Sequence, residues 1–327
     1  TTSKNNNNRL IMTTYKEING TNIEAVSSDP ANPVLGQIWY NTTTNVLKGV
    51  GFNATRAWAT GGNLNTARYG LGAAGNSNDS ALVFGGAPSG VTAATESYNG
   101  SSWTEVNDLN VAKYYIQGTG TQTAALALGG APPPSGTGAT ESWNGTSWTE
   151  VGDLNTGRLQ VAGVGTQTAA LVFGGSPNPK AVTESWNGSS WTEVADLNTG
   201  RAALGGAGTQ TAALGFGGNV SPNAQTESYN GSSWTEVNDL NTGRTGLAGA
   251  GVTNTAALAF GGYPVTAVTE EWNGSSWTEV ADLSTARESL AGTGTQASAL
   301  AVGGLPLTAA TEEWTGAGPI VQTFADS

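Results

Sequence analysis

The chain has 327 residues and a formal net charge of −12, and it contains no cysteine and no histidine. Disulfides, thiolate zinc sites and the activation of a nucleophile by histidine are therefore excluded. The 12 Lys and Arg are spread along the chain and form no basic patch for nucleic acid or an anionic lipid surface. We expect no nucleic-acid partner and, because no 18 apolar residues run together, no membrane insertion.

A fixed period organises most of the sequence. Six copies each of a Thr-Glu pair, a Gly-Gly pair, and a Trp followed ten residues later by a cation recur at this spacing. The glutamates are Glu96, Glu141, Glu184, Glu227, Glu270 and Glu312. The second glycines are Gly86, Gly130, Gly175, Gly218, Gly262 and Gly304. The Trp and cation pairs are Trp58 with Arg68, Trp103 with Lys113, Trp148 with Arg158, Trp191 with Arg201, Trp234 with Arg244, and Trp277 with Arg287. Such a period is typical of repeat architectures, so it determines the expected fold.

Each unit predicts four short strands. In the unit that begins at Arg201, a Gly-rich run leads into an alternating run over 212–218, and two further β-type runs flank Asn230-Gly231. An Asn-Gly pair between such runs predicts a hairpin with a type I′ turn. Gly and Ala fill the first two runs, whereas Tyr and Trp mark the third and fourth. This gradient is typical of a propeller blade, which is narrow near a central axis and wide outside.

The first and last units are incomplete in complementary ways. The last unit has its glycine pair and Thr311–Trp314 but lacks a following Ser-Trp-Thr-Glu, whereas Trp58 precedes the first unit. We expect the strand around Trp58 to complete the blade that begins at Arg287, and so to close the ring. Residues 46–53 are also strand-like and could add to this blade.

The repeat resembles a known family. The residues that carry the resemblance are the glycine doublet, the aromatic third strand, the Trp of the fourth strand and the trailing Arg, as in Gly174-Gly175, Trp186, Trp191 and Arg201. Together they resemble the kelch repeat over about residues 55–316. The resemblance implies an all-β, six-bladed kelch-like β-propeller over 55–318, with an N-terminal extension over 1–54 and a C-terminal tail over 319–327. It does not specify a function, because one fold serves many functions.

The acidic residues are repetitive. Sixteen of the 24 carboxylates recur at equivalent positions in nearly every unit. A glycosidase needs one particular pair of carboxylates in one cleft, and an equivalent set in every blade singles out no such pair. We expect no enzyme, no cofactor and no metal site. Each repeat cation is expected to pair with a repeat acid in its own or the next blade, and some Asp to cap turns.

The six copies disagree in two places: the loop after each glycine pair, and the residues just after each cation. In an up-and-down blade, the connection from the second to the third strand and the connection to the next blade emerge on the same face. The repetitive Gly-Thr-Gln-Thr and Asn-Gly-Ser-Ser turns lie on the opposite face. Because loops on a rigid scaffold carry binding residues, we expect a ligand-binding site on the variable face. The candidate residues are Tyr114, Tyr115, Gln117, Pro133, Lys180 and Tyr263.

The N-terminal segment suggests a biological setting. Residues 32–49, which read Asn-Pro-Val-Leu-Gly-Gln-Ile-Trp-Tyr-Asn-Thr and end in Val-Leu-Lys-Gly, resemble a strand-turn-strand element of structural and tail-fibre proteins of tailed bacteriophages, especially marine ones. The near-identical repeats are similar to kelch proteins of phage virions. The resemblance implies a virion location, other virion proteins as partners of residues 1–54, and a variable face turned to a host-surface glycan or protein. Residues 1–8 are expected to be extended or disordered.

Two other functions remain open. One is a secreted or cell-surface lectin-like propeller that binds glycans, with an extracellular location. It would need an aromatic residue flanked by polar groups in several blades. The other is a polysaccharide-degrading enzyme, which would need a convergent pair of carboxylates at the axis.

Overall fold

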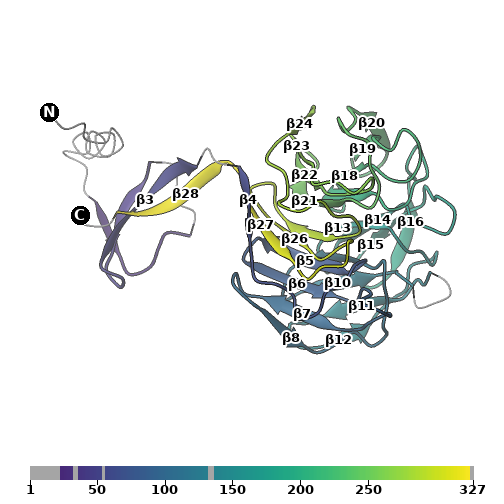
Figure 1. The fold of residues 1–327 in the computed structure, drawn as a ribbon, viewed down its shortest axis with the longest axis horizontal. Coiled ribbons are helices and arrows are strands. Elements are labelled where there is room, and N and C mark those ends of the chain that lie inside the picture. Colours follow the sequence, from purple (N-terminus) through teal and green to yellow (C-terminus); the bar gives the residue numbers. More distant parts are fainter. Residues whose placement is uncertain (1–22, 32–35, 54–55, 132–135, 325–327) are drawn as a thin grey trace. The chain divides into compact units, whose positions relative to one another are not determined.

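A computed structural model describes residues 23–31, 36–53, 56–131 and 136–324. These residues form strands and loops, with no helix among them. The chain divides into two compact units, residues 1–54 with 317–327 and residues 55–316 (Figure 1). The fold is therefore all-β. The expected disorder of residues 1–8 and the candidate Pro133 lie outside the described residues.

The first unit contains one four-stranded sheet, in the order β1 (Glu24–Val26), β2 (Ile38–Asn41), β3 (Val46–Asn53) and β28 (Gly318–Phe324). β1 is parallel to β2, and the other pairs are antiparallel. Residues 46–53 thus belong to this sheet and do not extend the last repeat. Residues 319–324 form most of a strand that pairs along β3, so the prediction that they are part of a tail is wrong. The sequence did not reveal this strand, because a backbone pairing between chain ends has no local sequence signal.

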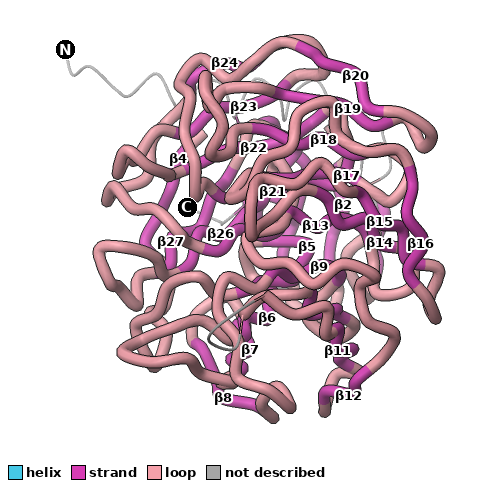
Figure 2. The backbone as a smooth tube through the Cα atoms, turned by 90° about the vertical axis from the view of Figure 1, so that its right-hand side faces the viewer, coloured by secondary structure: helices cyan, strands magenta, loops and turns pink. Residues whose placement is uncertain are grey.

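The second unit is propeller-like: it consists of repeated four-stranded antiparallel sheets, which follow one another around a common centre (Figure 2). We number them in chain order of their first strands. The first comprises β5 (Gly72–Ser77), β6 (Ser80–Phe84), β7 (Thr95–Tyr98) and β8 (Trp103–Val106). The second comprises β9 (Gln117–Gly120), β10 (Ala125–Leu128), β11 (Thr140–Trp143) and β12 (Trp148–Glu150). The third comprises β13 (Ala162–Gly165), β14 (Ala170–Phe173), β15 (Thr183–Trp186) and β16 (Trp191–Val194).

The other three sheets repeat this order. The fourth comprises β17 (Gly205–Gly208), β18 (Ala213–Phe216), β19 (Thr226–Tyr229) and β20 (Trp234–Val237). The fifth comprises β21 (Ala248–Thr253), β22 (Ala256–Phe260), β23 (Thr269–Trp272) and β24 (Trp277–Glu279). The sixth comprises β25 (Ala291–Gly294), β26 (Ser298–Val302), β27 (Thr311–Thr315) and β4 (Ala57–Thr60), which pairs with β27 so that Trp58 lies opposite Trp314.

The core lies between neighbouring sheets. The second strand of each sheet is buried on both faces, as in β10, which explains its apolar run. Phe84 of the first sheet meets the edge of Trp148 of the second, with ring centroids 4.8 Å apart. The indole nitrogen of Trp148 donates to the hydroxyl of Thr95 in the first sheet. The same indole bond to the preceding sheet is made by Trp58, Trp103, Trp234 and Trp277.

A buried ion pair anchors every sheet. The Arg158 guanidinium donates to Glu184 at 2.8 Å and to the carbonyls of Gly174 and Val182, and both charged side chains are fully buried. The second carboxylate oxygen of Glu184 accepts hydrogen bonds from the backbone and side chain of Asn155. The expected pairing of repeat cations with repeat acids is confirmed. The other pairs are Arg68–Glu96, Lys113–Glu141, Arg201–Glu227, Arg244–Glu270 and Arg287–Glu312.

Short polar side chains organise the turns. Asp108 accepts a hydrogen bond from the amide of Thr95, and Asp153, Asp196, Asp239 and Asp282 do the same for the third strands of the next four sheets.

The Asn-Gly hairpins are present, but the predicted type I′ turn is wrong. Tyr98 pairs with Trp103, so four residues form the loop, and only Gly100 of the Asn-Gly pair has a positive φ. The Asn99 side chain accepts the amides of Ser101 and Ser102, which makes an Asx turn.

The contacts of β4 predict a test of its role. Trp58 packs against Phe260 and Trp314, with ring centroids 4.9 and 5.3 Å away, and its indole donates to Thr269. We expect Trp58→Ala to lower the free energy of unfolding by about 3 kcal/mol, because it removes a large packed ring. Chemical denaturation of the full chain measures this. Val111→Ala, at a half-exposed position, is the control and should change it by less than about 0.5 kcal/mol. An equal effect of both changes would show that β4 contributes little.

The one lysine among the anchoring cations predicts a second test. Lys113 contacts Glu141 at 3.0 Å and one carbonyl at 3.4 Å, whereas Arg158 donates to a carboxylate and two carbonyls. We expect Lys113→Arg to stabilise the chain by about 1 kcal/mol and Arg158→Lys to destabilise it by about as much. Thermal denaturation compares them, with exposed Arg56→Lys as the control. Two shifts of the same sign would contradict the argument.

Candidate functional site

Six equivalent residues precede the first strands of the six sheets, each two positions after an anchoring cation. They are Gly70, Tyr115, Gln160, Ala203, Gly246 and Ser289. All six have a left-handed backbone, with φ between 49° and 61°. This conformation is unusual for Tyr and Gln. The shared backbone together with the different side chains makes this set unlike the rest of the repeat, and we call it the rim.

Backbone hydrogen bonds join the rim residues to one another. Each amide donates to the carbonyl of the rim residue in the preceding sheet: Gln160 to Tyr115, Ala203 to Gln160, Gly246 to Ala203, Ser289 to Gly246, and Gly70 to Ser289, at 2.8 to 3.1 Å. Between Tyr115 and Gly70 the bond comes from the next amide, that of Ile116, at 3.4 Å. The rim backbone is therefore held without any contribution from the rim side chains.

A pocket of about 70 Å³ lies within the rim. Its walls carry one aliphatic residue from each sheet, directly after the rim residue: Leu71, Ile116, Val161, Leu204, Leu247 and Leu290. All six are buried. The polar side chains of the lining are those of Tyr115, Gln117, Gln160 and Ser289, and none of the described lining residues is charged. We call this the rim pocket.

Tyr115 covers one side of the rim pocket. A Cβ atom built on Gly70 would lie 3.0 Å from the Tyr115 ring, so the ring lies directly over the bare backbone of Gly70. Tyr114 and Tyr69 pack against it, with centroids 4.7 and 6.0 Å away. Burial raises the pKa of the Tyr115 hydroxyl, and a side-chain hydrogen bond with Ser289 acts in the opposite direction. The opposite side, at Ala203 and Gly246, carries almost no side chain.

The structure brings together only some of the candidate residues. Tyr115 and Gln117 line the rim pocket, and Tyr114 stacks on Tyr115. Lys180 and Tyr263 lie in the loops after β14 and β22 and do not line the pocket, and Tyr263 is 55% exposed. Isolated backbone bridges join the residue before the rim to these loops, as between Thr245 and Tyr263. The two variable regions are therefore adjacent.

Two lining residues were missing from the candidates. Gln160 and Ser289 belong to the rim, and their only sequence signal is their position two residues after a cation. That signal could have been found by aligning the six units on their cations. The left-handed backbone that groups them cannot be deduced from residue types such as Gln, Ala and Ser, which rarely adopt it.

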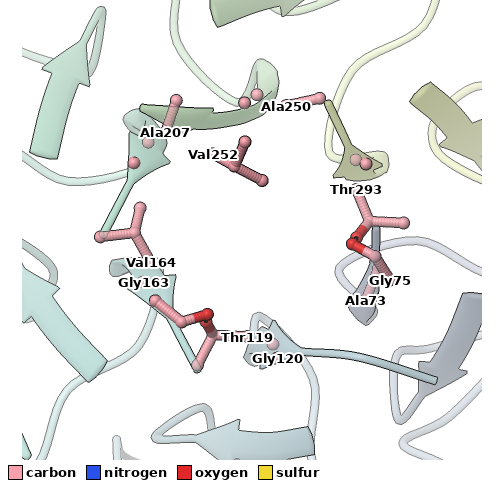
Figure 3. A pocket seen from close by; sticks show the side chains of 18 of the residues that line it. Ala73, Gly75, Thr119, Gly120, Gly163, Val164, Ala207, Ala250, Val252 and Thr293 are labelled. Atoms are coloured by element: carbon pink, nitrogen blue, oxygen red, sulfur yellow. Dashed lines mark hydrogen bonds between the residues drawn. The ribbon is translucent and has the colours of Figure 1, made fainter. Parts of the chain in front are cut away.

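A second cavity of about 70 Å³ is lined mainly by Gly and other small residues of the innermost strands (Figure 3). The hydroxyls of Thr119 and Thr293 donate to carbonyls of neighbouring sheets. Side chains of the repetitive turns, such as Gln122 and Gln167, also donate to carbonyls of the preceding sheet. These turn residues hold the sheets together. None of the described lining residues is acidic, and no described group of three or more Asp or Glu could hold a metal ion.

Comparisons with known proteins give no assignment. No family model matches the chain, and no curated protein is similar to it. The part of the chain that the structure describes contains no helix long and apolar enough to cross a membrane.

The first unit has its own polar cluster, around Asp29. This carboxylate accepts hydrogen bonds from Lys48, Asn41 and the indole of Trp39, at 2.6 to 3.0 Å. The bonds from Lys48, then Asn41 and Trp39, lower the pKa of Asp29 to about 2. Trp39 itself is fully buried. The cluster connects β2 and β3 to the loop after β1.

The lowered pKa of Asp29 gives a pH-dependent prediction. A depressed pKa means that the cluster stabilises the first unit above the ordinary Asp pKa of about 3.9, and that this contribution is lost as the pH falls toward about 2. We expect the indole N–H resonance of Trp39 to titrate with a midpoint near 2 in NMR spectra. Asp29→Asn is the control and should abolish the transition. A midpoint near 4 would contradict the hydrogen-bonded cluster.

Proposed function

We propose that the second unit is a closed, six-bladed kelch-like propeller that acts as a non-catalytic recognition module in the virion of a tailed phage. The single observation that carries the proposal is the contrast at the rim, where an invariant hydrogen-bonded backbone presents six sites with different side chains. Residues 1–54 would attach to other virion proteins. The rim and the adjacent variable loops would bind a host-surface glycan or protein, or a neighbouring subunit.

Contacts between the sixth and first sheets support a closed ring. The Trp103 indole donates to Thr311, and Thr293 donates to the carbonyl of Gly75. Both contacts are of the kind that join consecutive sheets elsewhere. Tyr98 adds a hydrogen bond to Glu313, and burial, together with this bond, raises the pKa of Tyr98 to about 12. A ring that closes through such contacts is rigid enough to hold loops in fixed positions.

The distribution of acids supports a non-catalytic role. The six Thr-Glu carboxylates are buried in ion pairs with cations. The Asp that cap the third strands bind backbone amides instead of a substrate, and the acids of the fourth strands, such as Glu105, are exposed. The pair of carboxylates that glycoside hydrolysis needs is absent from the described lining of both cavities.

A lectin-like protein that is secreted or displayed on a cell surface is the second candidate. The specific observation in its favour is the composition of the rim pocket, in which an aromatic ring lies beside uncharged amide and hydroxyl groups. The phage setting rests on the resemblance of residues 32–49 and of the repeats to phage structural proteins. Both candidates use the same face of the second unit.

Particle analysis and binding assays test the proposal. We expect mass spectrometry of purified phage particles to detect this chain, and cryo-EM to place residues 1–54 against another virion protein. The fluorescently labelled full chain should bind host cells, and the loop changes Lys180→Ser and Tyr263→Ser together should weaken binding about tenfold, which corresponds to about 1.4 kcal/mol.

The matched control is Val252→Ser, at a half-exposed residue that lines the other cavity. It should bind cells like the unchanged protein. Absence of the chain from particles would refute the virion role and leave the lectin-like candidate. Unchanged cell binding by the loop variant would refute the role of the variable loops.

A further inference from the structure

We propose that the rim pocket binds one edge of a neutral hexose at the end of a glycan chain. The proposal rests on the function proposed above and names the chemistry of its ligand. The pocket is open to solvent and measures about 70 Å³, so it takes part of a sugar ring and does not enclose it.

The polar groups of the pocket match hydroxyl groups. Gln117 and Gln160 each carry an amide that donates and accepts, and Tyr115 and Ser289 each carry a hydroxyl that does both. A sugar hydroxyl also donates and accepts, so each of these amide and hydroxyl groups can pair with it either as a donor or as an acceptor. The Gln117 amide already donates to the carbonyl of Gly118, and its oxygen is left to accept. The Gln160 oxygen already accepts from the Ser176 hydroxyl, and its amide hydrogens are left to donate. A ligand rich in hydroxyls therefore leaves few polar groups unpaired.

The apolar surface of the pocket matches the C–H face of a sugar. The six aliphatic residues that follow the rim residues line the pocket, and the Tyr115 ring adds an aromatic surface over Gly70. Tyr114 and Tyr69 support that ring from behind. A hexose presents apolar C–H groups on one side of its ring and hydroxyls at its edge. It can thus contact both parts of the lining together.

The charges around the pocket favour a neutral ligand. No described lining residue is charged, so a charged ligand would lose its hydration without gaining a partner. The carboxylate of Glu288 lies close to the rim, since one of its oxygens would be 3.8 Å from a Cβ atom at Gly246. This acid is positioned to repel sialic and uronic acids. The net charge of −12 also repels such acidic sugars.

The asymmetry of the rim places the sugar on one side. Tyr115 fills the space above Gly70, whereas Ala203 and Gly246 leave the opposite side open. Gln160 borders the open side because it is the rim neighbour of Ala203. A sugar that enters here would meet Gln160 at its edge. Changes at positions 160 and 203 should therefore affect binding most.

The repeats supply variants that the backbone already accepts. Gln160→Ala reproduces the residue at position 203, and Ala203→Gln reproduces the residue at position 160, in the same left-handed conformation. The first removes a polar partner, and the second fills the open side. Both variants should remain folded, because the bonds between rim residues use backbone atoms; Gln160→Ala should lower the melting temperature slightly, because it also removes the bond from the Ser176 hydroxyl to the side-chain oxygen.

The experiment uses the full chain and saturation-transfer NMR with the methyl glycosides of glucose, galactose, mannose and N-acetylglucosamine, followed by titration of those that bind. We expect at least one glycoside to bind with a dissociation constant of about 1 mM, which is typical of a small open site. Gln160→Ala and Ala203→Gln should each weaken it at least fivefold. Val252→Ser should not change it.

Three results would overturn the proposal: no saturation transfer to any of the four glycosides, equal binding by the Ala203→Gln variant, or binding of tetramethylammonium or methyl sialoside in place of the neutral sugars. If any one of these results occurs while the Lys180 and Tyr263 variant still loses cell binding, the proposed sugar site is wrong, but the proposed recognition face stands. If cell binding does not depend on those loops but the glycosides bind at the rim, the sugar site is retained.

Discussion

The buried pair between a repeat cation and a repeat glutamate is the contact on which the other features of the second unit depend. Burying two charges costs hydration free energy, and the cost is offset only when their hydrogen-bonding groups find partners. In the third sheet both carboxylate oxygens of Glu184 and all three nitrogens of the Arg158 guanidinium have such partners. In four of the other sheets the Arg Nε remains unpaired, at Arg68, Arg201, Arg244 and Arg287. Burial lowers the pKa of these arginines, against the effect of the nearby carboxylates.

Each cation also joins its sheet to the preceding one. Its side chain reaches the third strand of its own sheet, while its carbonyl accepts a hydrogen bond from the second glycine of the preceding sheet, as Arg158 does from Gly130. Gly130 has a φ of 88°, a conformation that favours glycine, and a Cβ there would crowd Ile116 and Tyr114. The rim follows the cation by two residues. Its backbone is therefore fixed from both sides, and its side chains are free to differ.

Sequence reasoning reached the features that the period multiplies. Six copies of the same spacing indicated the four-stranded sheets, the pairing of each repeat cation with a repeat acid, and capping by some of the repeat Asp residues, because each depends on residue types that carry a local or charge signal. Sequence reasoning missed the features that depend on backbone geometry. The turn at Asn99 has an Asx form because its side chain accepts two amides, and the pairing of β28 with β3 links segments more than 260 residues apart. Tyr115 and Gln117 were found through their difference from the other copies. Gln160 and Ser289 were missed because the rim is defined by φ.

The variation of the repeat is concentrated beside the aromatic side of the rim pocket. The segments between the glycine pair and the Thr-Glu acid are longest after Gly86 and Gly130. Tyr69 and Tyr114 form their backbone bridges to Ala87 and Ala131, the first residues of those two segments. Insertions there leave the buried ion pairs untouched, since both partners lie outside the loops. A scaffold of this kind can change what it contacts by exchanging a rim side chain or lengthening one loop, because the buried ion pairs and the backbone bonds between rim residues stay in place.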